Sequence, residues 1–106
     1  MLDLDTELKT TGIPFKRLYW VKAPVYPYGI YDDVLLIRGD DERLTIVEHN
    51  TTLELYAEKI DVESEAKIEE WLKSKKFEFE KTQIWIDSEK HYQTIYEFEF
   101  IEKKGV

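Results

Sequence analysis

Alternation between large apolar and polar side chains is the clearest pattern in this sequence. In "HYQTIYEFEF", residues 91–100, every second residue from Tyr92 to Phe100 is large and apolar except Thr94. A period of two places these side chains on one face of a β-strand, because successive residues of a strand point to opposite faces. The pattern therefore predicts a strand with one buried face and one solvent-exposed face.

Four further segments have β-strand patterns, and two connecting segments have turn chemistry. The four strand-like segments are residues 15–21, 33–39, 44–60 and 77–87. The second of them, "DVLLIRG", is expected to be a short buried strand. Pro24 and Pro27 mark a loop or sheet edge before it, because proline cannot donate to a ladder of hydrogen bonds. "RGDDE", residues 38–42, is the strongest turn signal in the chain.

The apolar residues change parity within two of these strands. In the strand from residue 44 to 60, Leu44 and Ile46 fall on the opposite parity from Val47. A bulge near His49 or Asn50 would reconcile the two halves, since a bulge inserts one extra residue. A similar change of parity in the strand 77–87 predicts a turn or bulge at Lys81 to Gln83.

Two segments are typical of helices. Residues 2–12 predict a short helix that is capped by Asp3 or Asp5 and ends at Gly12. Residues 61–76, "DVESEAKIEEWLKSKK", predict a longer helix with Asp61 as its N-cap. Acids at its start and lysines at its end suit the helix dipole.

The order of elements predicts one α+β domain over residues 1–106. Strands that follow one another without alternating helices favour an antiparallel sheet with helices on one face. We expect a mostly antiparallel sheet of four to five strands. A short N-terminal helix and a helix at about 61–75 should pack on it, and a β-hairpin at about 77–101 should end the chain.

The charge balance excludes some classes of partner. The chain has 23 acids and 15 bases, a net charge of −8, and it has no cysteine. A protein with this net charge repels nucleic acid unless its bases cluster on one surface. The two groups of lysines in this chain, at 73–76 and 103–104, are small and are expected to be solvated. We expect no sequence-specific nucleic-acid binding and no membrane association. Cytoplasmic expression is expected, since the N-terminus lacks the pattern of a signal peptide.

Candidate catalytic and metal-binding residues are few. His49 and His91 lack the spacing of a metal pair and are interpreted as surface residues of strands. The acidic clusters Asp32–Asp33 and Asp40–Asp41–Glu42 are interpreted as turn residues exposed to water. No glycine-rich phosphate loop or nucleophile motif is present, so neither an enzymatic activity nor a cofactor or metal is expected.

One segment, "LYWVKAPVYPYGIY", is unusually rich in aromatic residues. Tyrosine and tryptophan are enriched at the centres of protein interfaces. These rings either cover one end of the core or face a partner, and the sequence leaves both interpretations open. The candidate interface residues are Trp20, Tyr26, Pro27, Tyr28 and Tyr31.

The chain resembles a family of viral structural proteins. The segments that carry the resemblance are "YPYGIYDD", "EHNTTLELYAEKID", "EEWLKSKKFEFEK" and "IDSEKHYQTIYEFEF". With these segments the chain resembles the small tail completion, or tail terminator, proteins of long-tailed bacteriophages and prophages of Gram-positive bacteria. The resemblance covers most of the sequence, from Gly12 to Glu102.

The resemblance implies a protomer that works by assembly. It implies self-association into a ring, typically a hexamer, with the isolated chain able to remain monomeric. The ring would lie on the end of the tail tube, contact the tail tube protein and join it to the head–tail connector protein. The resemblance also implies assembly in the cytoplasm of the bacterial host and a place in the virion tail.

Two other classes of function remain open from the residues alone. The first is an acidic protein-binding module, either a DNA mimic or an inhibitor of a host protein, with no catalytic activity. The second is a small enzyme, which would need a pocket that joins His49 or His91 to buried acids. A ring protein and a DNA mimic are distinguished by their oligomeric state.

Overall fold

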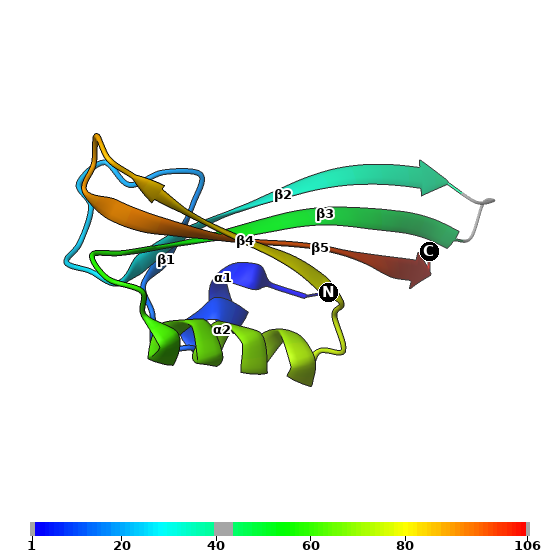
Figure 1. Ribbon diagram of the computed structural model, residues 1–106. Helices are drawn as coiled ribbons and strands as arrows, with labels where there is room; N and C mark the ends of the chain where they lie inside the picture. The colour runs from blue at the N-terminus through cyan, green and yellow to red at the C-terminus, as the bar shows by residue number, and fades with distance from the viewer. Residues whose placement is uncertain (1, 40–43, 106) are drawn as a thin grey trace.

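A computed structural model describes residues 2–39 and 44–105, with backbone alone for the last two (Figure 1). Its elements are α1 (Leu4–Lys9), β1 (Phe15–Arg17), β2 (Tyr28–Gly39), β3 (Leu44–Ala57), α2 (Val62–Ser74), β4 (Phe79–Ile86) and β5 (His91–Gly105). The five strands form one sheet in the order β1-β2-β3-β5-β4. Only β1 and β2 are parallel. Both helices lie on one face of the sheet, so the predicted α+β class is confirmed.

The inner face of the sheet, which faces the helices, carries the core. Odd-numbered residues of β3 and even-numbered residues of β5 point to this face, as the alternation of apolar residues predicted. Burial of these side chains against the two helices supplies the main favourable term in folding. The buried core consists of Leu4, Leu8, Ile13, Tyr31, Leu53, Leu55, Ile68, Trp71, Leu72, Tyr96 and Phe98.

The helix boundaries agree with the sequence signals. Asp3 caps α1 by accepting a bond from the Thr6 amide, and Asp61 caps α2 by accepting one from the Ser64 amide. Gly12 follows α1 with a φ of 77°, a conformation that glycine adopts without steric cost. No helix in the described ranges is long and apolar enough to cross a membrane.

Lys81 fixes α2 to the edge of the sheet. Its amine on β4 lies 2.7 Å from Glu65 and 2.8 Å from Glu69, both on α2. Burial favours the neutral amine, but the two carboxylates outweigh it and raise the pKa of Lys81. The Tyr96 hydroxyl also donates to Glu69 at 2.9 Å, so the same carboxylate holds β5 and β4 to the helix.

Glu7 joins the two helices to each other. Its Oε1 lies 2.8 Å from the Lys75 amine and accepts a 3.2 Å hydrogen bond from the Trp71 indole. The bond with Lys75, followed by the bond with Trp71, lowers the pKa of Glu7 below its ordinary value of 4.5. The interaction therefore stabilises the fold only while Glu7 is ionised.

Glu7→Gln should cost stability at neutral pH, and the cost should shrink in acid. A folded-state pKa below 4.5 means that the contribution is complete above pH 4.5 and is lost as pH falls through the folded value. The loss at pH 7 should be below about 1 kcal/mol, since the pair is partly solvated. Urea unfolding at pH 7 and pH 3 measures it.

Glu63→Gln is the matched control, because it removes an exposed ion pair with Lys67 within α2. It should change stability little at either pH. An equal loss for Glu7→Gln at both pH values would show that the carboxylate charge contributes nothing.

Neither of the predicted bulges is present. β3 pairs with β2 and with β5 one residue to one along its length, and β4 pairs with β5 in the same regular way. Buried residues of β3 keep one parity from Val47 to Ala57, because the polar residues His49 and Thr51 occupy the inner face. The prediction was wrong because it assigned the buried face to apolar residues alone.

The far half of the sheet extends beyond the helices as a three-stranded arm. This arm consists of residues 34–39 of β2, 44–50 of β3 and 99–105 of β5; β4 reaches β5 only as far as Phe98. Figure 1 shows no helix under it. Val34, Leu36 and Ile37 are 60%, 52% and 61% exposed, so the prediction of a buried strand at 33–39 was wrong. Part of the predicted "RGDDE" turn lies outside the described residues.

Gly29 allows β1 to pack against β2. A Cβ atom at this position would overlap the Phe15 ring, whose strand pairs with Gly29 in parallel. Phe15 is partly buried against the core, so its ring has little freedom to move away. β1 is only three residues long, and the predicted strand 15–21 therefore ends at Arg17.

Gly29→Ala should destabilise the fold by about 1–3 kcal/mol, the usual cost of overpacking a filled site. Gly39→Ala is the matched control, since a Cβ there meets no atom within 4 Å. Urea unfolding of the two variants gives the comparison. Equal stability of both variants would contradict the tight contact with Phe15.

Candidate functional site

Five rings form an aromatic cluster at the end of the sheet opposite the arm. Tyr26 stacks on Tyr28 with centroids 5.5 Å apart, and Tyr28 stacks on Tyr56 at 5.3 Å. His91 contacts Tyr26 and Tyr56 at 5.8 and 4.9 Å, and Trp20 meets Tyr28 edge-on at 6.4 Å. The cluster joins the segment between β1 and β2 to the outer face of the sheet, away from the helices.

The polar atoms of the aromatic cluster bond partly to one another and partly to neighbouring residues. The Tyr26 hydroxyl lies 2.9 Å from Nδ1 of His91, a side chain only 6% exposed. Burial, together with the negative charge of Glu54, raises the pKa of Tyr56 to about 12. Its phenol therefore stays neutral at physiological pH. The prediction that His91 is a surface residue was wrong, because the segment between β1 and β2 folds over it.

The structure brings three of the five candidate interface residues together. Trp20, Tyr26 and Tyr28 belong to the aromatic cluster, each with part of its surface exposed, and Pro27 lies between two of them. Tyr31 lies on the inner face instead, buried in the core with its hydroxyl donating to Asp5 at 3.4 Å. The rings thus cover one end of the sheet, and a partner contact through them stays a prediction.

His49 is the centre of a polar network on the inner face. Its Nδ1 lies 2.7 Å from Oδ2 of Asp33, whose Oδ1 accepts a 3.0 Å bond from Thr51. Its Nε2 lies 2.7 Å from Oε1 of Glu102, without the angles of a hydrogen bond, and both atoms are buried. The ring also stacks on Phe100, 4.0 Å between centroids.

This network corrects two expectations about polar residues. His49 is 2% exposed, so it is not a surface histidine, and Asp33 is a strand residue rather than part of a solvated turn. Glu102 also accepts a 3.2 Å bond from the Leu2 amide, which holds the start of the chain against β5. The network joins β2, β3 and β5 to the start of the chain.

His49→Leu should destabilise the fold by about 1–3 kcal/mol, because it leaves buried carboxylate oxygens of Asp33 and Glu102 without their partner. Thermal or urea unfolding measures the loss. The double variant Asp33→Val with His49→Leu removes one stranded carboxylate and should recover part of it. Single-variant losses that simply add would contradict the coupling.

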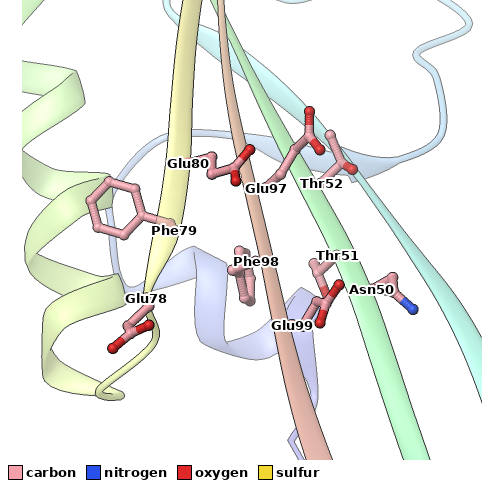
Figure 2. A pocket seen from close by; sticks show the side chains of 9 residues that line it. All are labelled: Asn50, Thr51, Thr52, Glu78, Phe79, Glu80, Glu97, Phe98 and Glu99. Carbon is pink, nitrogen blue, oxygen red and sulfur yellow. The ribbon is translucent and has the colours of Figure 1, made fainter.

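A hollow of about 560 Å³ lies over β3, β5 and β4. Glu80, Glu97 and Thr52 share one row of the strand register there, and Glu99 lies one row toward the arm. Figure 2 shows the side chains of Glu80, Glu97 and Thr52 close to one another. The hollow presents an acidic surface to solvent.

The described residues do not form a metal site, and they do not bring the two histidines together. No group of three or more histidine, aspartate or glutamate side chains among them is arranged to hold a metal ion. His49 and His91 belong to separate networks, and neither lines the acidic hollow. The described surface offers exposed acidic, aromatic and aliphatic side chains.

A basic segment at residues 16–25 completes the set of surface features. It carries Lys16, Arg17 and Lys22 and no acid, and its apolar side chains are largely exposed; Val25 is 86% exposed. The Trp20 indole donates to the Gly29 carbonyl at 2.8 Å and holds the segment against the sheet. The sequence analysis missed this feature. Its signal was the absence of acids between Ile13 and Tyr31.

Comparison with known proteins gives a match in structure alone. No protein-family model and no curated protein matches the sequence. The solved structures that match include a chain from the virion of a native gene transfer agent (GTA) particle. The TM-score is 0.55, the sequence identity is 9%, and the match covers 93% of this chain and 83% of that chain. At this identity the likeness shows a shared fold.

Proposed function

We propose that this chain is a structural protein of a phage-like particle. The observation that carries the proposal is the likeness in fold to a chain of a gene transfer agent virion, which extends over 93% of the present chain. The resemblance of its sequence segments to tail completion proteins points the same way. Both concern the whole length of the chain rather than one local motif.

The finer proposal is a tail terminator or completion protein. Copies would form a ring, a hexamer in the assembled tail, that lies on the end of the tail tube and joins it to the head–tail connector. Assembly would take place in the cytoplasm of the bacterial host. A ring repeats one heterologous contact until it closes, and therefore needs two different exposed surfaces on each copy.

Surface chemistry supports an assembly protein over an enzyme. The arm exposes aliphatic side chains on both of its faces, and two of its edges are unpaired within the described strands. Exposed edges with apolar side chains are a hazard for a protein that works alone, since other strands pair with them. In an assembled particle the same surfaces are covered.

An acidic binding module remains the second candidate. The acidic hollow and the outer-face glutamates around it favour this alternative, because ordered carboxylates on one face resemble a row of phosphates. Such a protein would act as a monomer or dimer and would compete with nucleic acid for its target. A protein of this kind would not be expected to bind a tail tube.

Negative-stain microscopy of the chain mixed with tail tubes tests the proposal. The tubes should be assembled from the tube protein encoded beside this chain. We expect rings at one end of each tube and tubes that stop growing once capped. To test the alternative, the same sample is passed over a column that carries an arginine-rich protein. A DNA mimic would bind this column and would leave the tube ends bare. Bare ends at saturating protein would overturn the terminator role.

A further inference from the structure

One edge of the arm is open along β2. β1 pairs with β2 only between Gly29 and Tyr31, so no described strand lies on this side of β2 from Asp32 to Gly39. Figure 1 shows this part of β2 extending past β1 and past both helices. Backbone groups on an open edge pair with any strand that reaches them, so this edge is a surface for a further strand.

The direction of the backbone groups on this edge follows from the contacts with β1. The Gly29 amide donates to the Pro14 carbonyl at 2.8 Å. The Tyr31 carbonyl accepts from the Leu18 amide at the same distance. Both residues of β2 therefore direct their backbone groups toward the open side. Since these groups alternate along a regular strand, the other odd-numbered residues of β2 do the same.

Leu35 and Ile37 carry the backbone groups that are left for a partner. The Asp33 amide is already occupied, because it donates to the Asp32 carboxylate at 2.9 Å. Beyond it, the N–H and C=O groups of Leu35 and Ile37 face the open side without a described partner. They are the donors and acceptors that a further strand would meet.

The side chains of this edge lack the features that protect an open strand. Residues 34–37, "VLLI", are four consecutive aliphatic residues, each between 42% and 61% exposed. No charge, proline or bulge interrupts them, although proteins commonly place such features on open edges. Two other open edges differ, because residues 99–105 of β5 include four charged residues and β4 carries Glu80 and Lys81.

The charge of the arm allows two copies to approach each other there. With histidine neutral, the three segments of the arm contain three acids and three bases, whereas the whole chain has a net charge of −8. Two copies therefore repel through their bodies and not through their arms. Residues 40–43 add three acids and one base, but an antiparallel arrangement keeps the Gly39 ends of two arms apart.

We propose that two copies of this chain pair along this edge, with their β2 strands antiparallel and Leu36 opposite Leu36 of the second copy. In this register Leu35 faces Ile37 of the second copy, so the residues with free backbone groups oppose each other. Their side chains meet on the inner face, and the two Leu36 side chains meet on the outer face. The arms of the two copies then form one continuous sheet.

A second copy is the favoured occupant because the edge is complementary to itself. The register sets aliphatic side chains against aliphatic side chains, and Arg38 lies opposite Val34, so no like charges are opposed. Residues 99–105 of β5 in another copy would instead bring four charged residues to this edge. A contact that uses the same surface on both copies also closes at two, so it covers the edge without continuing into a fibre.

The proposed dimer should be weak. Stable interfaces bury roughly 800 Å² on each partner, and one short strand edge offers less. We therefore expect monomers in dilute solution and dimers at high protein concentration. The inference goes beyond the proposed function, because it concerns the free chain and a two-fold pair is not a step in closing a ring.

Cysteine pairing tests both the edge and its register, because the chain has no cysteine of its own. Leu36→Cys would face its own equivalent at a Cα separation of about 4.5 Å, within the range for a disulfide. Leu35→Cys and Ile37→Cys would face each other, and each would lie beyond disulfide reach of its own equivalent. Ile101→Cys is the control, since Ile101 is a similarly exposed aliphatic residue on β5 of the arm.

In a glutathione redox buffer, Leu36→Cys should form about tenfold more disulfide-linked dimer than Ile101→Cys, because pairing raises the effective concentration of the thiols. A mixture of Leu35→Cys and Ile37→Cys should likewise exceed either variant alone. Equal yields for Leu36→Cys and Ile101→Cys would overturn the proposal. A preferred link between these two variants in a mixture would also overturn it, since β5 of the second copy would then be the occupant.

Variants that block the edge test the contact without a cross-link. Sedimentation equilibrium of the wild-type chain should show monomers and dimers with no larger species. Leu36→Lys should weaken the dimer several-fold, because it sets two like charges opposite each other, whereas Ile101→Lys should leave the dimer unchanged. Leu35→Pro removes an amide that faces the open side and no bond to β3, so it should abolish the dimer.

Three results of sedimentation would contradict the dimer. They are a monomer at every concentration, a dimer that Leu36→Lys leaves intact, and open-ended assembly, since a two-fold contact closes at two. Leu36→Lys changes an exposed side chain, so it decides the matter even where Leu35→Pro does not fold. Capping of tail tubes is measured separately and bears only on the terminator role.

Discussion

The central constraint of this structure is the length of β3, which lies between two strands over almost its whole length. All fourteen of its residues pair with β5, and those from Thr45 to Tyr56 also pair with β2, without a bulge on either side. The two helices cover only the half of this ribbon that carries Leu53 and Leu55. The remainder is an arm whose backbone is satisfied and whose side chains are left for solvent or for a partner. Because β3 is longer than the part of the sheet that the helices cover, it belongs both to the packed body and to the exposed arm.

The His49 network lies where the body passes into the arm. There the helices no longer supply apolar cover, and the inner face changes from leucine and tyrosine to His49, Asp33 and Glu102. Burial of a polar group is costly unless it is hydrogen-bonded, and Asp33 supplies the bond to Nδ1 of His49, whereas Nε2 has none. Phe100 stacks on the imidazole ring. Through the amide of Leu2, the same network fixes the N-terminal segment, and with it α1, to the arm side of the sheet.

The sequence was sufficient for the elements whose signals are local. Capping by Asp61, the helix that follows and the alternation of β5 depend on neighbouring residues, and all three were predicted correctly. The bulge in β3 was predicted wrongly because His49 and Thr51 look polar in sequence, whereas their burial depends on partners far along the chain. For the same reason the sequence identified Trp20, Tyr26 and Tyr28 as members of one aromatic segment but did not indicate that Tyr31 points to the inner face. The basic segment was missed because its signal is an absence of acids, which a search for motifs does not register.

The distribution of charge along the molecule is uneven. An acidic chain that only needs solubility can mix its bases among its acids, as α2 does through its pair of Glu63 and Lys67. The basic segment departs from this mixing, because residues 13–31 contain three bases and no acid. A ring would need two different surfaces on each copy, and a contact between two different surfaces repeats until the rotation between copies closes a ring or runs on as a filament. A flat tube end would favour the closed ring over the filament. Copies bound to it would all lie at the same height along the tube axis, so that successive copies could differ only by a rotation about this axis.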